Sequence, residues 1–435
     1  MSSLFGALET AVSGLTAQSS AFGNISDNVA NSQTTGFKRI DTNFVDYLTT
    51  STAVTNDSGF VTGRPEYRNS VQGTIATSDN PLAIAISGNG FFQVAKETQA
   101  PNGTATVSPK TEYSRNGNFT LDKSGYLLNG SGEVLNGWLA DPVSGVVSQN
   151  QVLPIKIAQG SFSPVPTSQV TLSANLPATP AAAGPVASQI NVYDAKGALH
   201  TVSLSWTQNA ADSWTVAVSS PDAATPAIGG ADVKFGNASG NGVPAGTIGS
   251  LGATTGTVSA TSYSAGAEAD LTFTADFGSG PQSVKVDLGG FGQANGVTQF
   301  AGNNYNLRGL SQNGIPPGAF SSISLQANGD VNVNYDNGQS RVVAQIPIIK
   351  FNAPDELQRE DGQAFSATQA SGVALAQQAG LGGAGAIVTN ATEGSNVDIA
   401  TEFTKLIVAQ RAYSANTKMI TTAEEMLQQT IDMKR

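Results

Sequence analysis

The chain has 435 residues, a net charge of −11 and charged residues at only 12% of positions, against ~25% in typical soluble domains. This balance speaks against a nucleic-acid partner and against anionic lipid, because no basic stripe is present, and no apolar run approaches the ~20 residues of a membrane span. The absence of cysteine excludes disulfides and thiolate chemistry, and the single histidine, His200, removes most histidine-based catalytic and zinc schemes.

Residues 4–30 carry apolar side chains every four, then three, positions, which is the seven-residue period of helices that pack side by side. We predict that this stripe packs against other subunits, with Gln18 as its only polar member. Its apolar members are Leu4, Leu8, Ala11, Leu15, Phe22, Ile25 and Val29. Three glycines in this stretch each cost roughly 1 kcal/mol relative to alanine, so the helix should need partners. No basic residue precedes Lys38 and no apolar core precedes a cleavage site, so we expect no cleaved secretory signal.

Residues 32–75 are polar and rich in threonine, and we predict an extended linker with some strand. From residue 78 onward, short β-runs alternate with turns. Ten Asn-Gly dipeptides indicate hairpins, because a type I′ turn requires positive φ at both central residues. None of them lies in a terminal helix, so helical ends and a β-rich middle are separated in the sequence.

Five prolines between residues 163 and 185 indicate a domain boundary. Residues 220–265 are rich in Gly, Ala, Thr and Ser, which favours loops or a loosely specified β-region. We predict a mainly β protein with α-helical termini and nested domains. The predicted domains are terminal helices at 1–31 and 394–435 paired as a coiled coil, a linker at 32–75, a discontinuous inner β-domain at 76–160 and 303–393, and an inserted outer β-domain at 161–302.

A second stripe with the same period closes the chain, interrupted by Gln410, Thr417 and Glu424. We predict subunit packing for its apolar members, which are Ile399, Phe403, Leu406, Tyr413, Ile420, Leu427 and Ile431. Ser395 and Asp398 form an S-x-x-D pattern, in which Ser395 is expected to cap the helix start. Residues 398–435 carry five acidic and five basic side chains, so copies of this helix can pack without strong repulsion.

The candidate chemical motifs are weak. The G-x-G-x-x-G match at residues 380–385 has no convincing strand before it, and a flexible loop explains it better. His200 could act as a base with Asp194, but the segment has the pattern of a hairpin turn with a surface or edge histidine. Turns at 328–330 and 336–338 could bind calcium, but they lack the spaced carboxylates of a calcium loop. We therefore expect no enzyme activity, no catalytic residue, no metal and no cofactor.

The two terminal helices can either pack on a globular core of their own chain or form contacts between copies in a fibre. Their length, their heptad period and a middle that is β-complete without them favour the fibre. A β-rich surface adhesin is the alternative from a different class. It would stay monomeric and keep a ligand pocket.

Three groups of motifs resemble one family. NISDNVANSQTTGFK at 24–38 resembles the N-terminal signature of bacterial flagellar rod and hook proteins, and SNVDI at 395–399 with AQRAYSAN at 409–416 resembles their C-terminal signature. SGNGFF at 87–92, YSRNGNFT at 113–120 and GYLLNG at 125–130 are similar to their shared inner β-domain. The residues that carry the resemblance are Asn31, Thr35, Gly36, Phe37, Gly88, Gly90, Phe91, Phe92, Ser395, Asn396, Val397, Asp398, Gln410, Arg411, Tyr413 and Asn416.

The middle of the chain separates hook from rod. LSANL at 172–176 and VYDAKG at 192–197 resemble the extra outer domain of hook proteins, and FSATQASG at 365–372 resembles the return into the inner domain. Rod proteins of this pattern are much shorter, and a distal rod component is the alternative within the family.

The resemblance implies a structural subunit of the flagellar hook, a curved flexible tube that acts as a universal joint passing torque from rod to filament. It implies as partners further copies of the chain, the distal rod protein, the hook–filament junction protein, the hook cap and the flagellar type III export apparatus. It also implies an extracellular location in the flagellum and export without a cleaved signal peptide.

Overall fold

The computed structural model of the protein describes residues 2–51, 56–99, 105–141, 145–180 and 184–433, without the side chains of 2–5, 48–51, 56–58, 99 and 105. The chain forms two compact units. The first comprises Met1–Gln159, Ser321–Asn334 and Ser340–Arg435, and the second comprises Gly160–Phe320 and Tyr335–Gln339. Within the described ranges, no helix is long and apolar enough to cross a bilayer.

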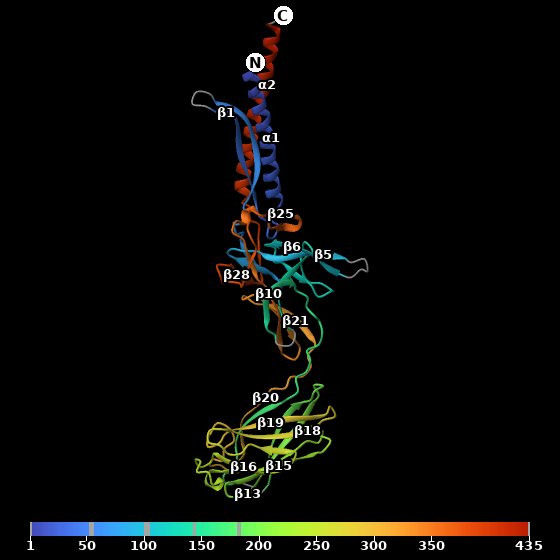
Figure 1. Ribbon diagram of the computed structural model, residues 1–435, viewed down its shortest axis with the longest axis vertical. Coiled ribbons are helices and arrows are strands. Elements are labelled where there is room, and N and C mark those ends of the chain that lie inside the picture. Colours follow the sequence, from blue (N-terminus) through green and yellow to red (C-terminus); the bar gives the residue numbers. More distant parts are fainter. Residues whose placement is uncertain (1, 52–55, 100–104, 142–144, 181–183, 434–435) are drawn as a thin grey trace. The chain divides into compact units, whose positions relative to one another are not determined.

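Two long helices from the chain ends lie side by side in the first unit, α1 (Ser2–Ala30) and α2 (Ile399–Asp432) (Figure 1). They run antiparallel, because Asn28 in the last turn of α1 donates a hydrogen bond to Glu402 in the first turn of α2. The predicted helical termini are therefore confirmed, and α2 begins at Ile399, directly after Asp398.

The start of α2 is capped by Asp398, whose carboxylate accepts a hydrogen bond from the Thr401 backbone N–H at 2.8 Å. The predicted cap, Ser395, is wrong: its hydroxyl accepts from the Val397 N–H at 3.3 Å, before the helix begins. The hydrogen bond from Thr401 lowers the pKa of Asp398. A carboxylate in this place also interacts favourably with the positive end of the helix dipole.

A long β-hairpin packs along α1 and consists of β1 (Ile40–Ser51) and β2 (Asn56–Tyr67). The Val61 N–H donates to Ser13 Oγ at 3.1 Å, and Asn24 Nδ2 donates to Thr42 Oγ1 at 2.8 Å. The predicted linker at 32–75 is thus mostly a hairpin, because Thr42 and the Val61 backbone, in a stretch whose polar composition resembles a loop, bond to the helix.

An 11-stranded sheet forms much of the rest of the first unit. Its main path is β21 (Phe320–Leu325), β22 (Asp330–Tyr335), β23 (Ser340–Gln345), β9 (Glu133–Ala140), β5 (Phe92–Gln99), β6 (Ala105–Ser114), β26 (Ala364–Ser366) and β25 (Gln358–Arg359). Beside this path lie β7 (Phe119–Leu121), β8 (Leu127–Asn129) and β10 (Val147–Pro154). The short helices η2 (Pro354–Glu356) and η3 (Asp361–Gln363) flank β25.

The first unit also contains three two-stranded antiparallel ladders, two of which join early and late parts of the chain. They are β24 (Ile348–Lys350) with β27 (Leu375–Gln377), β28 (Ala386–Thr389) with β4 (Ile84–Ser87), and β29 (Ala391–Glu393) with β3 (Ile75–Thr77). The last two ladders place the segment just before α2 beside the segment just after the hairpin, so the end of α1 and the start of α2 are held at the same end of the β-structure.

The second unit contains two five-stranded sheets around one core. One sheet has the order β17 (Val258–Ala260), β18 (Glu268–Asp276), β19 (Pro281–Gly290), β11 (Gln169–Asn175) and β20 (Asn306–Gln312). The other has the order β12 (Val186–Tyr193), β13 (Leu199–Ala210), β14 (Ser213–Ser219), β15 (Ala227–Phe235) and β16 (Ile248–Gly256), and η1 (Gly236–Ser239) follows β15. The indoles of Trp206 and Trp214 lie fully inside the core.

The structure decides one expectation about this unit and corrects another. Residues 220–265, for which loops or a loosely specified β-region were expected, form a β-region that contains β15, β16 and β17. The predicted end of the outer domain at 302 is too early, because β20 pairs with β11 and the unit continues to Phe320. A further correction concerns turns: Asn136 lies inside β9 rather than at a hairpin, and Asn102 falls outside the described residues.

Candidate functional site

Small side chains line the contact between the two terminal helices. In α1, Ala11, Ala17 and Ala21 are buried, and in α2 Ala409 and Ala423 are buried. Their size allows the two backbones to approach closely, and a methyl group added at Gly14 would lie 2.9 Å from Asn416 Nδ2. Phe22 and Tyr413 pack edge to face with ring centroids 6.2 Å apart.

The predicted apolar stripes behave differently in the two helices. In α1, Ala11 and Ile25 are buried, and Leu8, Leu15, Phe22 and Val29 are half-buried; the side chain of Leu4 lies outside the described residues. In α2, Leu406, Ile420 and Leu427 are half-buried, whereas Ile399, Phe403, Tyr413 and Ile431 are exposed. The stripe of α2 that faces α1 instead contains Glu402, Ala409, Asn416 and Ala423, which keep the seven-residue spacing.

This difference leaves an apolar surface on α2. Phe403 is 50% exposed, Val408 is 62% exposed and Met419 is 56% exposed. Ile407, Met426 and Ile431 are exposed as well. We call these six exposed residues the outer α2 face, although they spread around more than one side of the helix and Val408 also lines the groove between α1, α2 and β1. Exposed apolar side chains in this number on one element mark sites of protein–protein contact.

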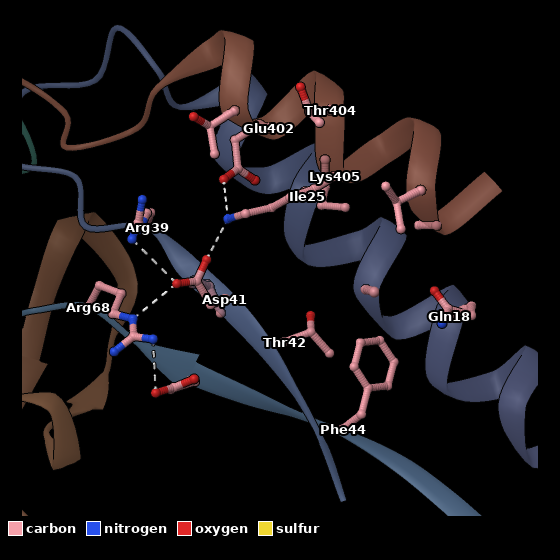
Figure 2. Close-up of a pocket in the computed structure, with 16 residues that line it drawn as sticks. Gln18, Ile25, Arg39, Asp41, Thr42, Phe44, Arg68, Glu402, Thr404 and Lys405 are labelled. Atoms are coloured by element: carbon pink, nitrogen blue, oxygen red, sulfur yellow. Dashed lines mark hydrogen bonds and ion pairs between the residues drawn. The ribbon is translucent and has the colours of Figure 1, made fainter. Parts of the chain in front are cut away.

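A charged network ties α2 to the hairpin, as Figure 2 shows. Lys405 Nζ donates to Asp41 Oδ1 and to Glu402 Oε1, both at 2.7 Å. Arg68 Nε donates to Asp41 Oδ2 at 3.0 Å. Burial acts against the charge of Asp41, but the hydrogen bonds from Lys405 and Arg68 outweigh it and lower the pKa of this carboxyl group.

The network closes one end of a groove of about 520 Å³ between α1, α2 and β1. Ala21, Ile25 and Ile40 are buried and line its apolar part, and the half-exposed ring of Phe44 stands at its side (Figure 2). Asn28, also buried, joins the two helices to the hairpin, since its amide donates to Ile40 O and Glu402 Oε2 while its carbonyl oxygen accepts from the Ile40 N–H.

A second, fully buried ion cluster lies at the base of the helices. Glu393 accepts from Lys38 Nζ at 2.6 Å and from Arg115 Nη1 at 2.9 Å. The Gly73 N–H donates to the same carboxylate at 2.8 Å. Burial lowers the pKa of Lys38 to about 8, although the charge of Glu393 opposes this shift, and burial also lowers the pKa of Arg115. We call Lys38, Arg115 and Glu393 the buried triad.

Residues from several of the motifs that carry the family resemblance contact the buried triad. Gly36 has φ +74° and its N–H donates to Glu393 O at 2.8 Å; a Cβ at this position would lie 2.7 Å from the Asn116 backbone nitrogen. Gly88 O accepts from Arg115 Nη2 at 2.8 Å. The Arg115 guanidinium lies 5.3 Å from the centre of the Phe91 ring.

Asn396 connects the triad to the first turn of α2. Its side-chain oxygen accepts from the Arg39 N–H at 2.7 Å, and its amide donates to Arg68 O and Val71 O. Phe37 and Phe92, which neighbour Lys38 and Phe91 in the sequence, are buried. A Cβ at Gly90 would lie 2.2 Å from Ile348 Cγ2. Asn31, Thr35 and Val397 are half-buried, while Gln410 and Arg411 are exposed, and no side-chain hydrogen bond or ion pair of either occurs among the described residues.

Motif recognition found Gly36, Phe91 and Asn396 but missed Lys38, Arg115 and Glu393 as a unit. Glu402, Lys405 and Asp41 were also missed. The sequence signal that could have found them is a charged residue inside a run of apolar or small residues. Such a charge predicts a buried ion pair, since charged side chains are rarely buried unless paired. The sequence offers no hint of which charge is the partner.

The other candidate motifs remain isolated. His200 is stacked on Phe277, and its Nε2 lies 3.7 Å from Asp194 Oδ2, beyond hydrogen-bonding distance. The 380–385 segment joins β27 to β28 as a turn and opens no helix. In the described part of the chain, no three His, Asp or Glu side chains gather as a metal site.

Four family models match the chain. The "Flagella basal body rod protein" model matches residues 8–38, and the "Flagellar basal body rod FlgEFG protein C-terminal" model matches residues 388–433. The "Flagellar hook protein FlgE/F/G D1 domain" model matches residues 85–175, and the "Flagellar basal body protein FlaE D2 domain" model matches residues 165–315. Together with the paired terminal helices and the nested β-units, these matches define an axial subunit of the bacterial flagellum.

Full-length relatives specify the kind of axial subunit. Flagellar hook protein FlgE of Brucella melitensis is 32% identical over 100% of both chains, and that of Rhizobium meliloti is 30% identical over 100% of both. The Escherichia coli protein of the same name is 30% identical over 98% of this chain and 100% of its own. A crystal structure of Helicobacter pylori flagellar hook protein FlgE2 covers 72% of this chain and 98% of its own, with a TM-score of 0.46 and 13% identity. The chain belongs to the flagellar hook protein family.

Proposed function

We propose that this structural subunit of the flagellar hook polymerises through its paired terminal helices, with the outer α2 face as the contact between subunits. The tube so formed would be curved and flexible and would act as a universal joint between rod and filament. A contact between unlike surfaces of identical subunits does not close on itself and extends as a helical fibre.

The outer α2 face is the observation that carries this proposal. Its six apolar side chains are exposed on α2 in the single chain, so an assembly that covers them gains stability that the single chain lacks. Burying one such side chain contributes about 1.5–3 kcal/mol. The predicted packing residues Ile399 and Tyr413 are also exposed on α2 and would be buried in the same assembly.

The same proposal extends to partners and place. The distal rod protein and the hook–filament junction protein would meet the two ends of the polymer. The hook cap would guide assembly, and the type III export apparatus would deliver the unfolded chain without cleavage of a signal. The hook would then lie outside the cell, as an assembly without enzyme activity.

The test is assembly of the full chain with Phe403→Asp and Val408→Asp together. Both side chains are exposed, so the monomer should melt as the wild type does, while the critical concentration for polymerisation should rise on the order of tenfold or more. Ser414→Asp, at an exposed polar position of the same helix, is the matched control and should assemble normally. Normal assembly of the double variant would remove the outer α2 face from the proposal.

Electron microscopy of the wild-type polymer decides among the remaining functions. A curved tube is the expected result. A straight, thin rod would favour a distal rod component, and a chain that stays monomeric and binds glycans tightly would favour an adhesin.

A further inference from the structure

Two buried carboxyl groups lie on one face of the 11-stranded sheet. In the ladders, Glu112 of β6 stands opposite Val94 of β5, and Glu133 of β9 stands opposite Lys96 of β5. Val94 and Lys96 are two positions apart and point to the same face, and cross-strand partners share a face, so both glutamates lie there. Each of the two residues is only 1% exposed.

Each carboxyl group has one oxygen with a partner and one without. Glu133 Oε2 accepts from Asn129 Nδ2 at 2.7 Å, and Glu112 Oε1 pairs with Lys110 Nζ at 3.2 Å. Glu133 Oε1 and Glu112 Oε2 are buried and have no hydrogen-bond partner in the described part of the chain. Neither oxygen is accessible to water, so a negative charge on either carboxyl group is costly unless a cation or a proton compensates it.

The surrounding charges leave Glu133 without a counter-ion. Lys96 Nζ lies 3.9 Å from Glu112 Oε1, and Lys110 Nζ is shared between Glu112 and Glu360, at 2.8 Å from the latter. Within the described ranges, neither lysine forms an ion pair with Glu133. Burial raises the pKa of Glu133 to about 7; the Asn129 hydrogen bond opposes this rise, the charge of Glu112 adds to it and Lys96 opposes it.

A strained segment covers the Glu133 carboxyl group. Gly362 in η3 has φ +80°, and a Cβ there would lie 3.0 Å from Glu133 Oε1. The next residue, Gln363, has φ +64°, an uncommon conformation for a side chain other than glycine. Ser131 Oγ holds the segment by donating to Gly362 O at 2.9 Å.

We propose that the buried Glu133 carboxyl group carries a proton in the folded inner β-domain, that the charge of Glu112 favours this protonated form, and that the loss of the proton to water loosens η3 from the sheet. This proton site is independent of the assembly contacts on α2. A folded-state pKa above the unfolded value means that the site stabilises the fold fully below the unfolded pKa of 4.5, and that this contribution is lost as pH rises through about 7.

The test compares the full-length wild type with Glu133→Gln between pH 5 and pH 9. Infrared difference spectra should show a protonated carboxyl band near neutral pH in the wild type that titrates with a midpoint of about 7 and is absent from Glu133→Gln. Amide hydrogen exchange in η3, corrected for intrinsic rates, should accelerate above this pH in the wild type only. Glu268→Gln, an exposed position in the second unit, is the control and should keep the wild-type band.

A second variant tests the contribution of Glu112. In Glu112→Gln the repulsion is removed, so the titration midpoint of Glu133 should fall by about one pH unit. An unchanged midpoint would show that burial alone holds the proton and would overturn the role given to Glu112. The absence of any protonated carboxyl band near neutral pH in the wild type would overturn the site itself, even if Glu133→Gln failed to fold.

Discussion

Glu393 illustrates how much one residue can hold together in this protein. Its side chain neutralises two buried cations and binds the Gly73 amide, while its backbone oxygen accepts from Gly36. The cost of taking these charges out of water is recovered only while all partners are present. The buried triad therefore specifies how these segments of the first unit pack together rather than adding much net stability.

We predict that Glu393→Gln destabilises the first unit by about 3–5 kcal/mol, because Lys38 and Arg115 become buried charges without a counter-ion. Guanidinium unfolding measures the loss in the free energy of unfolding, and hydrogen exchange in β3 and β29 locates it. Glu356→Gln, at an exposed position, serves as the control. Adding Lys38→Met to Glu393→Gln should restore part of the loss; a further loss would contradict the charge argument.

At this scale, sequence motifs predicted which segments matter but not why. The glycine at position 36 was recognisable as part of a signature, and its positive φ beside Asn116 explains the requirement. The partnership of Lys38 and Glu393 could not be predicted, because their separation of 355 residues leaves no local spacing from which to infer contact. The proton site on Glu133 was invisible for the same reason.

The elements show a related pattern of success and failure. Both terminal helices followed from their heptad period, yet α2 turns Ala409 and Ala423 toward α1 and leaves Phe403 outside. Periodicity indicates that a helix has an apolar stripe, but it does not say whether the stripe is filled by the same chain or by another. The strands in residues 220–265 were only loosely specified by the sequence, because Gly229 and Gly230 in β15 weaken the β-pattern. The structure requires glycine there, since a Cβ at either position would lie within 3 Å of a neighbouring backbone oxygen.

The capping of α2 gives a prediction at this scale. Asp398→Ala should destabilise the first turn of the helix by about 1 kcal/mol, since it removes both the Thr401 cap and a charge at the positive helix end. Ser395→Ala should cost much less, because that hydroxyl bonds before the helix starts. Hydrogen exchange of the amides at 400–402 distinguishes the two variants. An equal effect of both would contradict the assignment of the cap.

At the scale of the whole molecule, each unit has its own core, so each should unfold as its own cooperative transition. Trp206→Ala should remove about 3–5 kcal/mol from the second unit and lower its calorimetric transition by roughly 10 °C, without moving the other transition. Leu199→Ala, at a side chain 52% exposed in the same unit, is the control. A shift of both transitions together would show that the units unfold as one.

The nested order of the domains followed from the sequence, while their edges did not. Proline-rich composition located the first boundary, since a change in composition is visible along the chain. The second boundary depends on β20 joining β11, a pairing across more than a hundred residues that leaves no compositional mark.

The ladders that close the first unit have a consequence for the time course of folding. Strands β3 and β4 have no partner until β28 and β29 are present, near the far end of the chain. The second unit, by contrast, is complete once residue 339 is available. In a chain that appears N-terminus first, the second unit can therefore reach its native structure while the ladders of the first unit are still unpaired. Contacts of such long sequence separation also form slowly. The ladders of the first unit can then pair only after nearly the whole chain is available.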